Sequence, residues 1–240
     1  MKIFGKNPCL EMLKTDARVE EIFLFEKIEE SFKQEVLKYA KNAQIKYCNK
    51  DLLNKMCDFK NHQGIVMFCE NYHYYDLEDI LNDNQKNENF FVLVLDNLED
   101  PQNLGSLVRT SECAKVDAII LPKNRSCKVN ETVYKVSAGA LSHVKICEVV
   151  NINETIKKLK KENVFVFGLE ADGKNIYSTN LTGRIALVVG SEGNGISNLT
   201  KKNCDEIVSI PLYGKINSLN ASVAGAIGIF EVVRQRYGKW

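Results

Sequence analysis

The sequence predicts an α/β protein with a mainly parallel sheet in its carboxyl-terminal part and a smaller α/β unit before it. Short, near-continuous apolar runs recur after residue 90, a pattern typical of strands covered on both faces. Segments with helical periodicity lie between these runs. A run of eight residues without an apolar side chain ends the segment 76–89, "DLEDILNDNQKNEN", which therefore reads as a linker between the two units.

The first unit, residues 1–75, alternates expected helices with expected strands. The helices are expected at 6–14, 29–42 and 51–57, and the strands at 19–26, 45–49 and 64–70.

The second unit, residues 90–240, repeats the alternation more strongly. Its strands are expected at 90–96, 117–122, 144–149, 164–170, 185–190 and 206–212, and its helices at 104–115, 131–140, 152–162, 196–203 and 219–236. The last helix is apolar nearly all round until Arg234, which indicates burial against the sheet or against a partner.

Composition excludes several classes of protein. Hydrophobic residues make up 45% and charged residues 26% of the 240 residues, as in a globular protein. The sequence shows no signal peptide and no apolar run of membrane-spanning length, so we expect a cytoplasmic protein that does not enter a membrane. The eight cysteines form no C-x-x-C pair and the three histidines are not clustered with them, so we expect reduced, mostly buried thiols and no metal.

The net charge of +1 is unevenly distributed. Residues 1–89 carry 13 Lys and Arg against 16 Asp and Glu, whereas residues 90–240 carry 19 against 15. Binding to RNA would therefore depend on a local patch and not on a strongly basic domain.

Three segments of the second unit carry polar residues where a bare scaffold does not need them. They are "LDNLEDPQNLGSLVRTSECA" (95–114), "ALVVGSEGNGIS" (186–197) and "IPLYGKINSLNASVAGAIGIF" (210–230). In each, a strand ends, polar groups follow and a helix starts. Taken singly, turns and helix caps explain them, with Asn103 as a cap of one helix and Asn217 or Ser218 of another. Together they indicate a ligand site at the carboxyl ends of the strands.

The glycine-rich segment is not a familiar nucleotide loop. Its G-x-x-G-x-G spacing, at Gly190, Gly193 and Gly195, matches neither the dinucleotide pattern nor the phosphate-binding loop. The loop after the strand at 90–96 also lacks the dinucleotide glycines, which argues against a nicotinamide-dependent dehydrogenase.

The three segments, in this order, resemble the motifs of the SpoU (TrmH) family of RNA 2′-O-ribose methyltransferases, in the SPOUT superfamily. The resemblance implies a carboxyl-terminal domain with a deep trefoil knot, S-adenosyl-L-methionine as cofactor, and a homodimer. It also implies an enzyme that methylates a ribose 2′-hydroxyl.

The resemblance assigns residues as well as a fold. The family's cofactor-contacting positions fall on Gly190, Ile210 and Leu219. Its key catalytic position falls on Arg109, and its other active-site positions fall on Asn103, Glu192, Ser218 and Asn220. Since a guanidinium is effectively always protonated, we interpret Arg109 as a ligand for the target nucleotide's phosphate or for the developing alkoxide, and not as a base.

The first unit extends the resemblance. "IFGKNPCLEML", "NHQGIVM" and "VSAGALSHVKI" (136–146) resemble the bacterial branch that methylates a guanosine of 23S rRNA, whose amino-terminal domain is L30e-like and binds RNA. On this basis we expect RNA contacts from Lys6, Asn7, His62 and Gln63, although a turn or cap explains each about equally well.

Several alternatives stay open at this point. They are a tRNA 2′-O-methyltransferase, a resistance-type rRNA enzyme, and a non-catalytic RNA-binding protein. The sequence leaves open whether naked rRNA or an assembly intermediate is the substrate, and whether Arg109 serves its own active site or a partner's.

Overall fold

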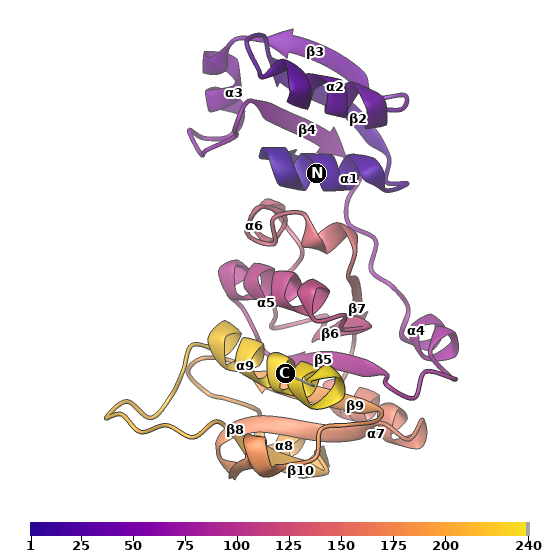
Figure 1. Ribbon diagram of the computed structural model, residues 1–240, viewed down its shortest axis with the longest axis vertical. Helices are drawn as coiled ribbons and strands as arrows, with labels where there is room; N and C mark the ends of the chain where they lie inside the picture. The colour runs from indigo at the N-terminus through magenta and orange to yellow at the C-terminus, as the bar shows by residue number, and fades with distance from the viewer. Residues whose placement is uncertain (239–240) are drawn as a thin grey trace. The chain divides into compact units, whose positions relative to one another are not determined.

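Strands and helices alternate along the chain in nearly the order that the apolar runs predict (Figure 1). The computed structural model describes residues 1–238, so the last two residues of the expected domain 90–240 lie outside it. The chain divides into two compact units: unit 1 holds residues 1–73 and 129–143, and unit 2 holds residues 74–128 and the chain from 144 onward.

Unit 1 is built on a four-stranded sheet of order β1-β4-β2-β3, in which only β2 and β3 pair in parallel. Its elements are β1 (Lys2–Phe4), α1 (Lys6–Lys14), β2 (Val19–Phe25), α2 (Glu30–Tyr39), β3 (Gln44–Cys48), α3 (Lys50–Met56), β4 (Ile65–Cys69), α6 (Glu131–Val136) and the 3₁₀ turn η1 (Ala140–Ser142). The three-residue strand β1 was not predicted because it is too short to show an alternating pattern.

The segment 129–143 belongs to unit 1, although the sequence analysis assigned it to the second domain. Glu131 forms ion pairs with Lys2 and Lys60, and the imidazole Nε2 of His143 lies 2.8 Å from Oε2 of Glu11. The expected helix 131–140 ends early, at Val136, because the backbone then turns through positive φ at residues 138 and 139. Residues 129–143 lie between strands of unit 2 in the sequence, so their packing in unit 1 was not predicted.

Unit 2 is built on a six-stranded sheet of order β10-β8-β9-β5-β6-β7, and every pairing within it is parallel. Its elements are α4 (Leu77–Asp83), β5 (Phe91–Asp96), α5 (Pro101–Cys113), β6 (Ala118–Pro122), β7 (Lys145–Val149), α7 (Ile152–Lys161), β8 (Phe165–Asn175), η2 (Ile176–Ser178), β9 (Ile185–Gly190), α8 (Asn198–Asn203), β10 (Glu206–Ser209) and α9 (Ala221–Tyr237). The predicted α/β class with a mainly parallel sheet is confirmed. The expected trefoil knot is consistent with this strand order and stays a prediction.

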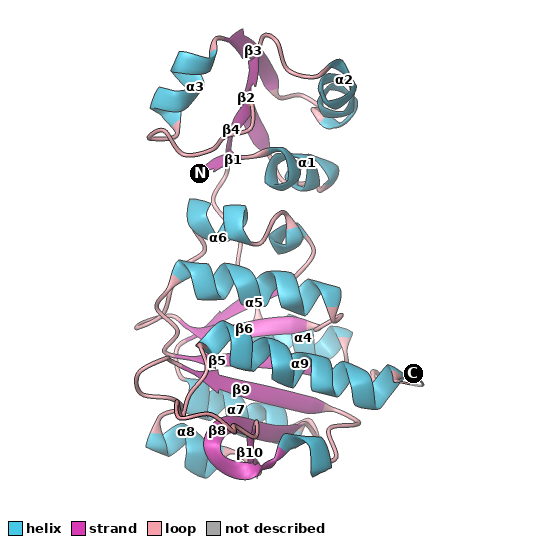
Figure 2. Ribbon diagram, turned by 60° about the vertical axis from the view of Figure 1, so that its left-hand side comes forward, coloured by secondary structure: helices cyan, strands magenta, loops and turns pink. Residues whose placement is uncertain are grey.

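Helices cover both faces of this sheet, as the apolar strands require (Figure 2). α5 and α9 pack together on one face. On the other face, α4 and α7 join a core with alternate residues of the central strands, such as Val92 and Val188. α9 lies close to its neighbours because it has glycines at the contacts: a Cβ at Gly225 would lie 2.6 Å from Leu107 of α5.

The structure corrects the expectation of a linker at 76–89. It contains α4, whose Leu77, Ile80 and Leu81 are buried in the core of unit 2. These side chains recur at helical spacing, but the polar residues around them gave the segment the composition of a linker. Even the polar run after α4 is held, because Arg184 donates hydrogen bonds to the carbonyl oxygens of Asn84 and Asn87.

The cysteines are as predicted for most positions. All eight are free thiols, and six of them are buried. Within residues 1–238, no helix is both long enough and apolar enough to cross a membrane.

Candidate active site

A cavity of about 310 Å³ opens at the carboxyl end of β9, beside the middle of β8 and the start of α9. The sequence-predicted cofactor residues Gly190, Ile210 and Leu219 all line it. Glu192 and Ser218 line it as well, so two segments that are far apart in the sequence meet there. A volume of this size lies at the lower end of the range for small-molecule sites.

Charge within this cavity has one sign. Among the described residues that line it, the ionisable side chains are the carboxylates Glu170 and Glu192, and none is Lys or Arg. Leu169, Val189 and Ile210 are among its apolar walls. Such a lining suits a cationic or neutral ligand with an apolar body and disfavours a phosphate.

The glycine-rich loop, defined here as residues 191–197, folds back on the end of β9. Ser191 and Gly195 exchange backbone hydrogen bonds of 3.2 and 2.9 Å. A Cβ at Gly190 would lie 2.1 Å from the carbonyl carbon of Gly195, and Gly195 itself has φ +62°. Gly190 and Gly195 are thus required by close approach and backbone conformation, whereas Gly193 has open space around it.

Two carboxylates hold the far end of this loop. Asp96, the buried last residue of β5, accepts a 2.9 Å hydrogen bond from the backbone N–H of Ser197. Glu170 accepts one from the N–H of Ile196. Neither residue has a role predicted from the sequence. The signal was an acidic side chain at the end of an apolar strand run, which appears at both positions.

Three of the predicted catalytic residues form a closed hydrogen-bonded cluster. The side-chain amide of Asn103 donates a 2.8 Å hydrogen bond to Oε1 of Glu192. The amide of Asn220 donates to the same oxygen and also, at 3.0 Å, to Oδ1 of Asn103. We call these three residues the Asn–Glu–Asn cluster. It joins the starts of two helices to the end of β9.

Helix capping brings the cluster together, but not as predicted. Asp100 caps α5, accepting from the N–H of Gln102, so Asn103 lies in the first turn with its side chain free for Glu192. Asn220 caps α9, replacing the expected Asn217 or Ser218. Its Oδ1 accepts from the N–H groups of Ser222 and Val223, which leaves its amide for the cluster.

Arg109 lies apart from this cluster. It follows Asn103 by six residues, which is about 240° around an α-helix, so the two side chains leave α5 in different directions. Arg109 is exposed, and among residues 1–238 no hydrogen bond or ion pair involves its side chain. Within one chain, the structure therefore unites Asn103, Glu192 and Asn220 but not Arg109.

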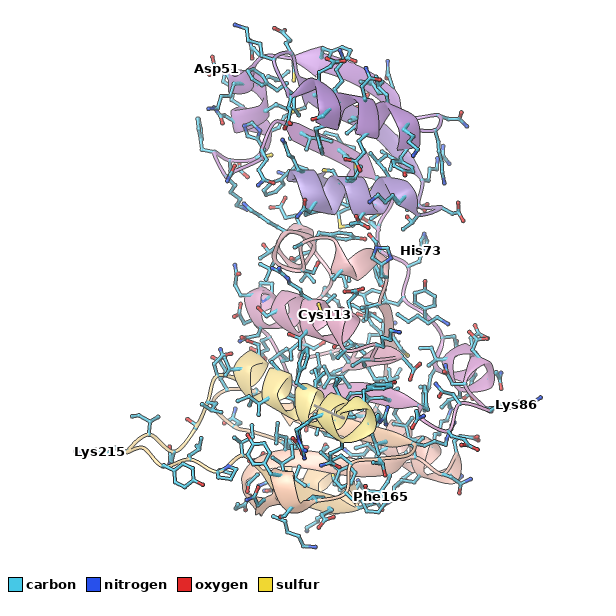
Figure 3. The ribbon with its side chains drawn as sticks, in the orientation of Figure 1. Asp51, His73, Lys86, Cys113, Phe165 and Lys215 are labelled. Carbon is cyan, nitrogen blue, oxygen red and sulfur yellow. The ribbon has the colours of Figure 1, made fainter. Side chains whose placement is uncertain are left out.

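The loop between β10 and α9 extends away from the body of unit 2. Figure 3 shows Lys215 at its tip. Ser218 in this loop is exposed, as are the apolar side chains of Tyr213 and Ile216. Ser218 therefore reaches the cavity from a segment with few packing contacts of its own.

The predicted RNA-contacting residues of unit 1 differ in their exposure to solvent. Asn7 and Gln63 are exposed, and Oε1 of Gln63 accepts a 2.8 Å hydrogen bond from the N–H of Lys6, so these three positions are neighbours. His62 is buried: its Nδ1 accepts from the N–H of Gly64 and its Nε2 lies 3.1 Å from Asn54 Oδ1. Burial also lowers the pKa of His62. For His62 the structural alternative holds, because no edge of its ring is open to RNA.

Within residues 1–238, no group of three or more His, Cys, Asp and Glu side chains is arranged to hold a metal ion.

Two family models match this chain. A model described as the SpoU rRNA methylase family matches residues 90–230. The chain belongs to the SpoU family of RNA methyltransferases. A second model, described as RNA 2′-O ribose methyltransferase substrate binding, matches residues 2–75.

Relatives of this SpoU-family chain cover almost its full length. The Bacillus subtilis (strain 168) protein YacO, whose name assigns it to the TrmH family of tRNA/rRNA methyltransferases, is 36% identical over 98% of this chain and 95% of its own. A Staphylococcus aureus (strain COL) protein named for the same family is 38% identical over 98% and 96%.

A solved structure extends the likeness of the fold. The SpoU methyltransferase AviRb from Streptomyces viridochromogenes, crystallised in complex with the cofactor AdoMet, superposes with a TM-score of 0.85 at 22% identity. The match covers 98% of this SpoU-family chain and 90% of AviRb. Both units of the fold are therefore shared.

Proposed function

We propose that this SpoU-family protein transfers a methyl group from S-adenosyl-L-methionine to the ribose 2′-hydroxyl of a nucleotide in RNA. We assign 23S rRNA as the substrate and a guanosine as the target nucleotide. The model for 2′-O ribose methyltransferase substrate binding over residues 2–75 supports the ribose position.

The charge of the cavity carries this proposal. S-adenosyl-L-methionine combines an adenosine body with a sulfonium cation and has no phosphate. Apolar walls fit the adenosine, and the carboxylates of Glu170 and Glu192 favour a cation. The Gly190 backbone, free of a Cβ, lines the same space. When bound there, the cofactor supplies an electrophilic methyl group.

The Asn–Glu–Asn cluster orients the reaction at the mouth of the cavity. Glu192 both lines the cavity and accepts hydrogen bonds from Asn103 and Asn220, so its carboxylate is fixed in position. Displacement at a methyl carbon requires the incoming hydroxyl to lie in line with the departing sulfur. Fixing two reactants in this way contributes about 7–11 kcal/mol in favourable cases.

Arg109 binds the RNA and does not act as the base. Its exposed, unpaired guanidinium is matched in geometry to phosphate oxygens. It thereby holds the target nucleotide, or stabilises the alkoxide that develops at the ribose. In unit 1, Lys6, Asn7 and Gln63 supply further contacts to structured RNA.

The protein acts as a homodimer in this proposal. The outward side of α9 exposes Val223, Phe230 and Tyr237, while its opposite side is buried on α5 and β9. A second copy of the chain covers these apolar side chains and brings its own Arg109 into the assembly.

Transfer of labelled methyl tests the proposal directly. Wild-type protein is incubated with labelled S-adenosyl-L-methionine and either unmodified 23S rRNA or unmodified tRNA. We expect label on rRNA alone, at one ribose. Arg109→Ala should slow the chemical step by about 2.7–4 kcal/mol and change cofactor affinity little. Lys161→Ala, which removes an exposed cation from α7, serves as the control.

Each contrary outcome has a definite meaning. Label on tRNA keeps the chemistry and overturns the assigned substrate. An unchanged single-turnover rate in Arg109→Ala overturns the role of that residue. No label on naked rRNA directs the assay to ribosome assembly intermediates, and no label there either leaves an RNA-binding protein without the activity.

A further inference from the structure

Glu170 has a position that the catalytic assignments do not use. It follows the apolar part of β8, and its side chain is 16% exposed. Its carboxylate accepts the hydrogen bond from the N–H of Ile196. A Cβ at Gly195 would lie 2.4 Å from its Oε1, so the glycine-rich loop approaches this carboxylate as closely as the chain allows.

Glu170 also contacts the helix that follows the loop. The ammonium of Lys201, in α8, lies 3.6 Å from Oε2 of Glu170 and 3.3 Å from Oδ1 of Asp172. One carboxylate thus holds the end of the loop through Ile196 and the next element through Lys201. Asp172 shares the lysine but is exposed, and among the described residues its side chain does not bond to the loop.

Of the two carboxylates that hold the loop, only Glu170 lines the cavity. Asp96 accepts from Ser197 behind the loop and is absent from the cavity wall, whereas Glu170 stands in that wall beside Gly195. A change in the position of Glu170 therefore alters the loop and the cavity together.

We propose that Glu170 is a positioning residue for the cofactor. It holds residues 191–197 in the conformation that forms one wall of the cavity, and it acts through this loop, not on the reacting atoms. This inference rests on the proposed function, because it takes the cavity as the site of S-adenosyl-L-methionine.

Three variants separate this role from simple stabilisation. Glu170→Ala removes the acceptor for the Ile196 N–H. Glu170→Gln keeps an acceptor oxygen of the same shape and loses the charge. Asp172→Asn is the matched control, because it removes a charge from the same strand and the same lysine without touching the loop. Each full-length protein is measured for S-adenosyl-L-methionine affinity by calorimetry, for exchange of the Ile196 amide hydrogen, and for KM and kcat with RNA.

Glu170→Ala should bind S-adenosyl-L-methionine about tenfold more weakly, since a hydrogen bond to a charged group is lost. The exchange of the Ile196 amide should accelerate by a similar factor. Glu170→Gln keeps the acceptor and should stay within about threefold of wild type in Ile196 exchange. Its cofactor affinity should lie between those of wild type and Glu170→Ala, because the charge that favours a cation is lost. Asp172→Asn should match wild type in both. The effect should appear in the KM for cofactor, with kcat at saturating cofactor and the KM for RNA nearly unchanged.

Several results would overturn the inference. One is wild-type cofactor affinity in Glu170→Ala; another is a Gln variant as impaired as the Ala variant. An equal loss of RNA affinity, or a loss explained by the folded fraction alone, would also do so. If wild-type protein binds no S-adenosyl-L-methionine, the proposed function fails, and unchanged Ile196 exchange in Glu170→Ala would then overturn the anchoring separately.

Discussion

Asn220 divides its side chain between two tasks. Its Oδ1 accepts from the first N–H groups of α9, and its amide donates to Asn103 and Glu192. In a sequence, capping alone explains an asparagine before an apolar helix. Capping and site formation are therefore rival interpretations of such a residue. In the folded chain they are compatible, because an amide has both an acceptor and a donor end.

The glycines at the end of β9 and in the loop differ in the space that surrounds them. This difference gives a prediction at the residue scale. Gly190→Ala should destabilise the protein by about 1–3 kcal/mol and weaken cofactor binding, because its Cβ would lie 2.1 Å from backbone. Gly193→Ala, with open space around it, is the control. Thermal unfolding and calorimetric titration of both variants check this. Equal behaviour of the two variants would contradict the assigned close approach.

At the scale of elements, two segments lie elsewhere in the fold than the sequence predicted. α4 packs into unit 2 although its surroundings are those of a linker, and residues 129–143 pack into unit 1 although they follow strand β6. Composition describes a segment's own residues, whereas domain membership depends on which core its few apolar side chains join.

The position of α4 predicts where the amino-terminal unit can be removed. Deletion of residues 1–73 should leave the core of unit 2 intact, whereas deletion of 1–89 also removes the buried Leu77, Ile80 and Leu81. Each such side chain contributes about 1.5–3 kcal/mol. The longer deletion should therefore unfold at a clearly lower temperature.

Scanning calorimetry of both deletions, with S-adenosyl-L-methionine titrations alongside, measures this difference. The shorter deletion should keep cofactor binding and lose RNA selectivity. Equal thermal stability of the two proteins would contradict the assignment of α4 to unit 2, and retained selectivity would contradict the role of unit 1.

The contact between Glu11 of α1 and His143 predicts a pH dependence within unit 1. A hydrogen bond from Lys14, and then one from His143, hold the pKa of Glu11 below its ordinary value of 4.5. A carboxylate whose pKa is lowered by folding stabilises the protein above the unfolded pKa, and this stabilisation is lost as the pH falls through the folded pKa.

Glu11→Gln should therefore lower the free energy of unfolding at pH 7, and the difference from wild type should shrink below about pH 4.5. The loss should stay under about 1 kcal/mol, because the pair is partly solvent-screened. Urea unfolding at several pH values measures it. Glu26→Gln, which removes an exposed carboxylate of unit 1 that has no ion pair among the described residues, is the control. A difference that does not vary with pH would exclude the ion-paired carboxylate as its cause.

At the scale of the whole molecule, α9 exposes Val223, Phe230 and Tyr237, the side that we propose for contact with a second copy. Phe230→Asp should shift the protein toward monomer, because a charge replaces an apolar side chain that is 48% exposed on this helix. Phe165→Asp, at 45% exposure on β8, matches it in residue type and exposure.

Sedimentation velocity across a concentration series measures the balance of monomer and dimer in each variant. The proposed interface requires a weaker dimer for Phe230→Asp only. Equal weakening by both variants, or a wild-type monomer at every concentration, would exclude α9 as the dimer surface.

By itself, the sequence determined the α/β class, the parallel strands of unit 2 and the residues of three motifs. These features are local: apolar runs, helical spacing and the chemistry at strand ends recur within short windows. The family resemblance added an expected role for each motif residue. The cavity unites Gly190, Ile210 and Leu219, for which it implied contact with the cofactor.

Only the tertiary structure decided which of these residues meet. The Asn–Glu–Asn cluster joins positions about a hundred residues apart, and Asp96 and Glu170 acquire their tasks from a loop that follows another strand. The membership of α4 in unit 2 arises in the same way. Each depends on a partner distant in sequence, and local propensity carries no information about such a partner because the contact forms only when the sheet assembles.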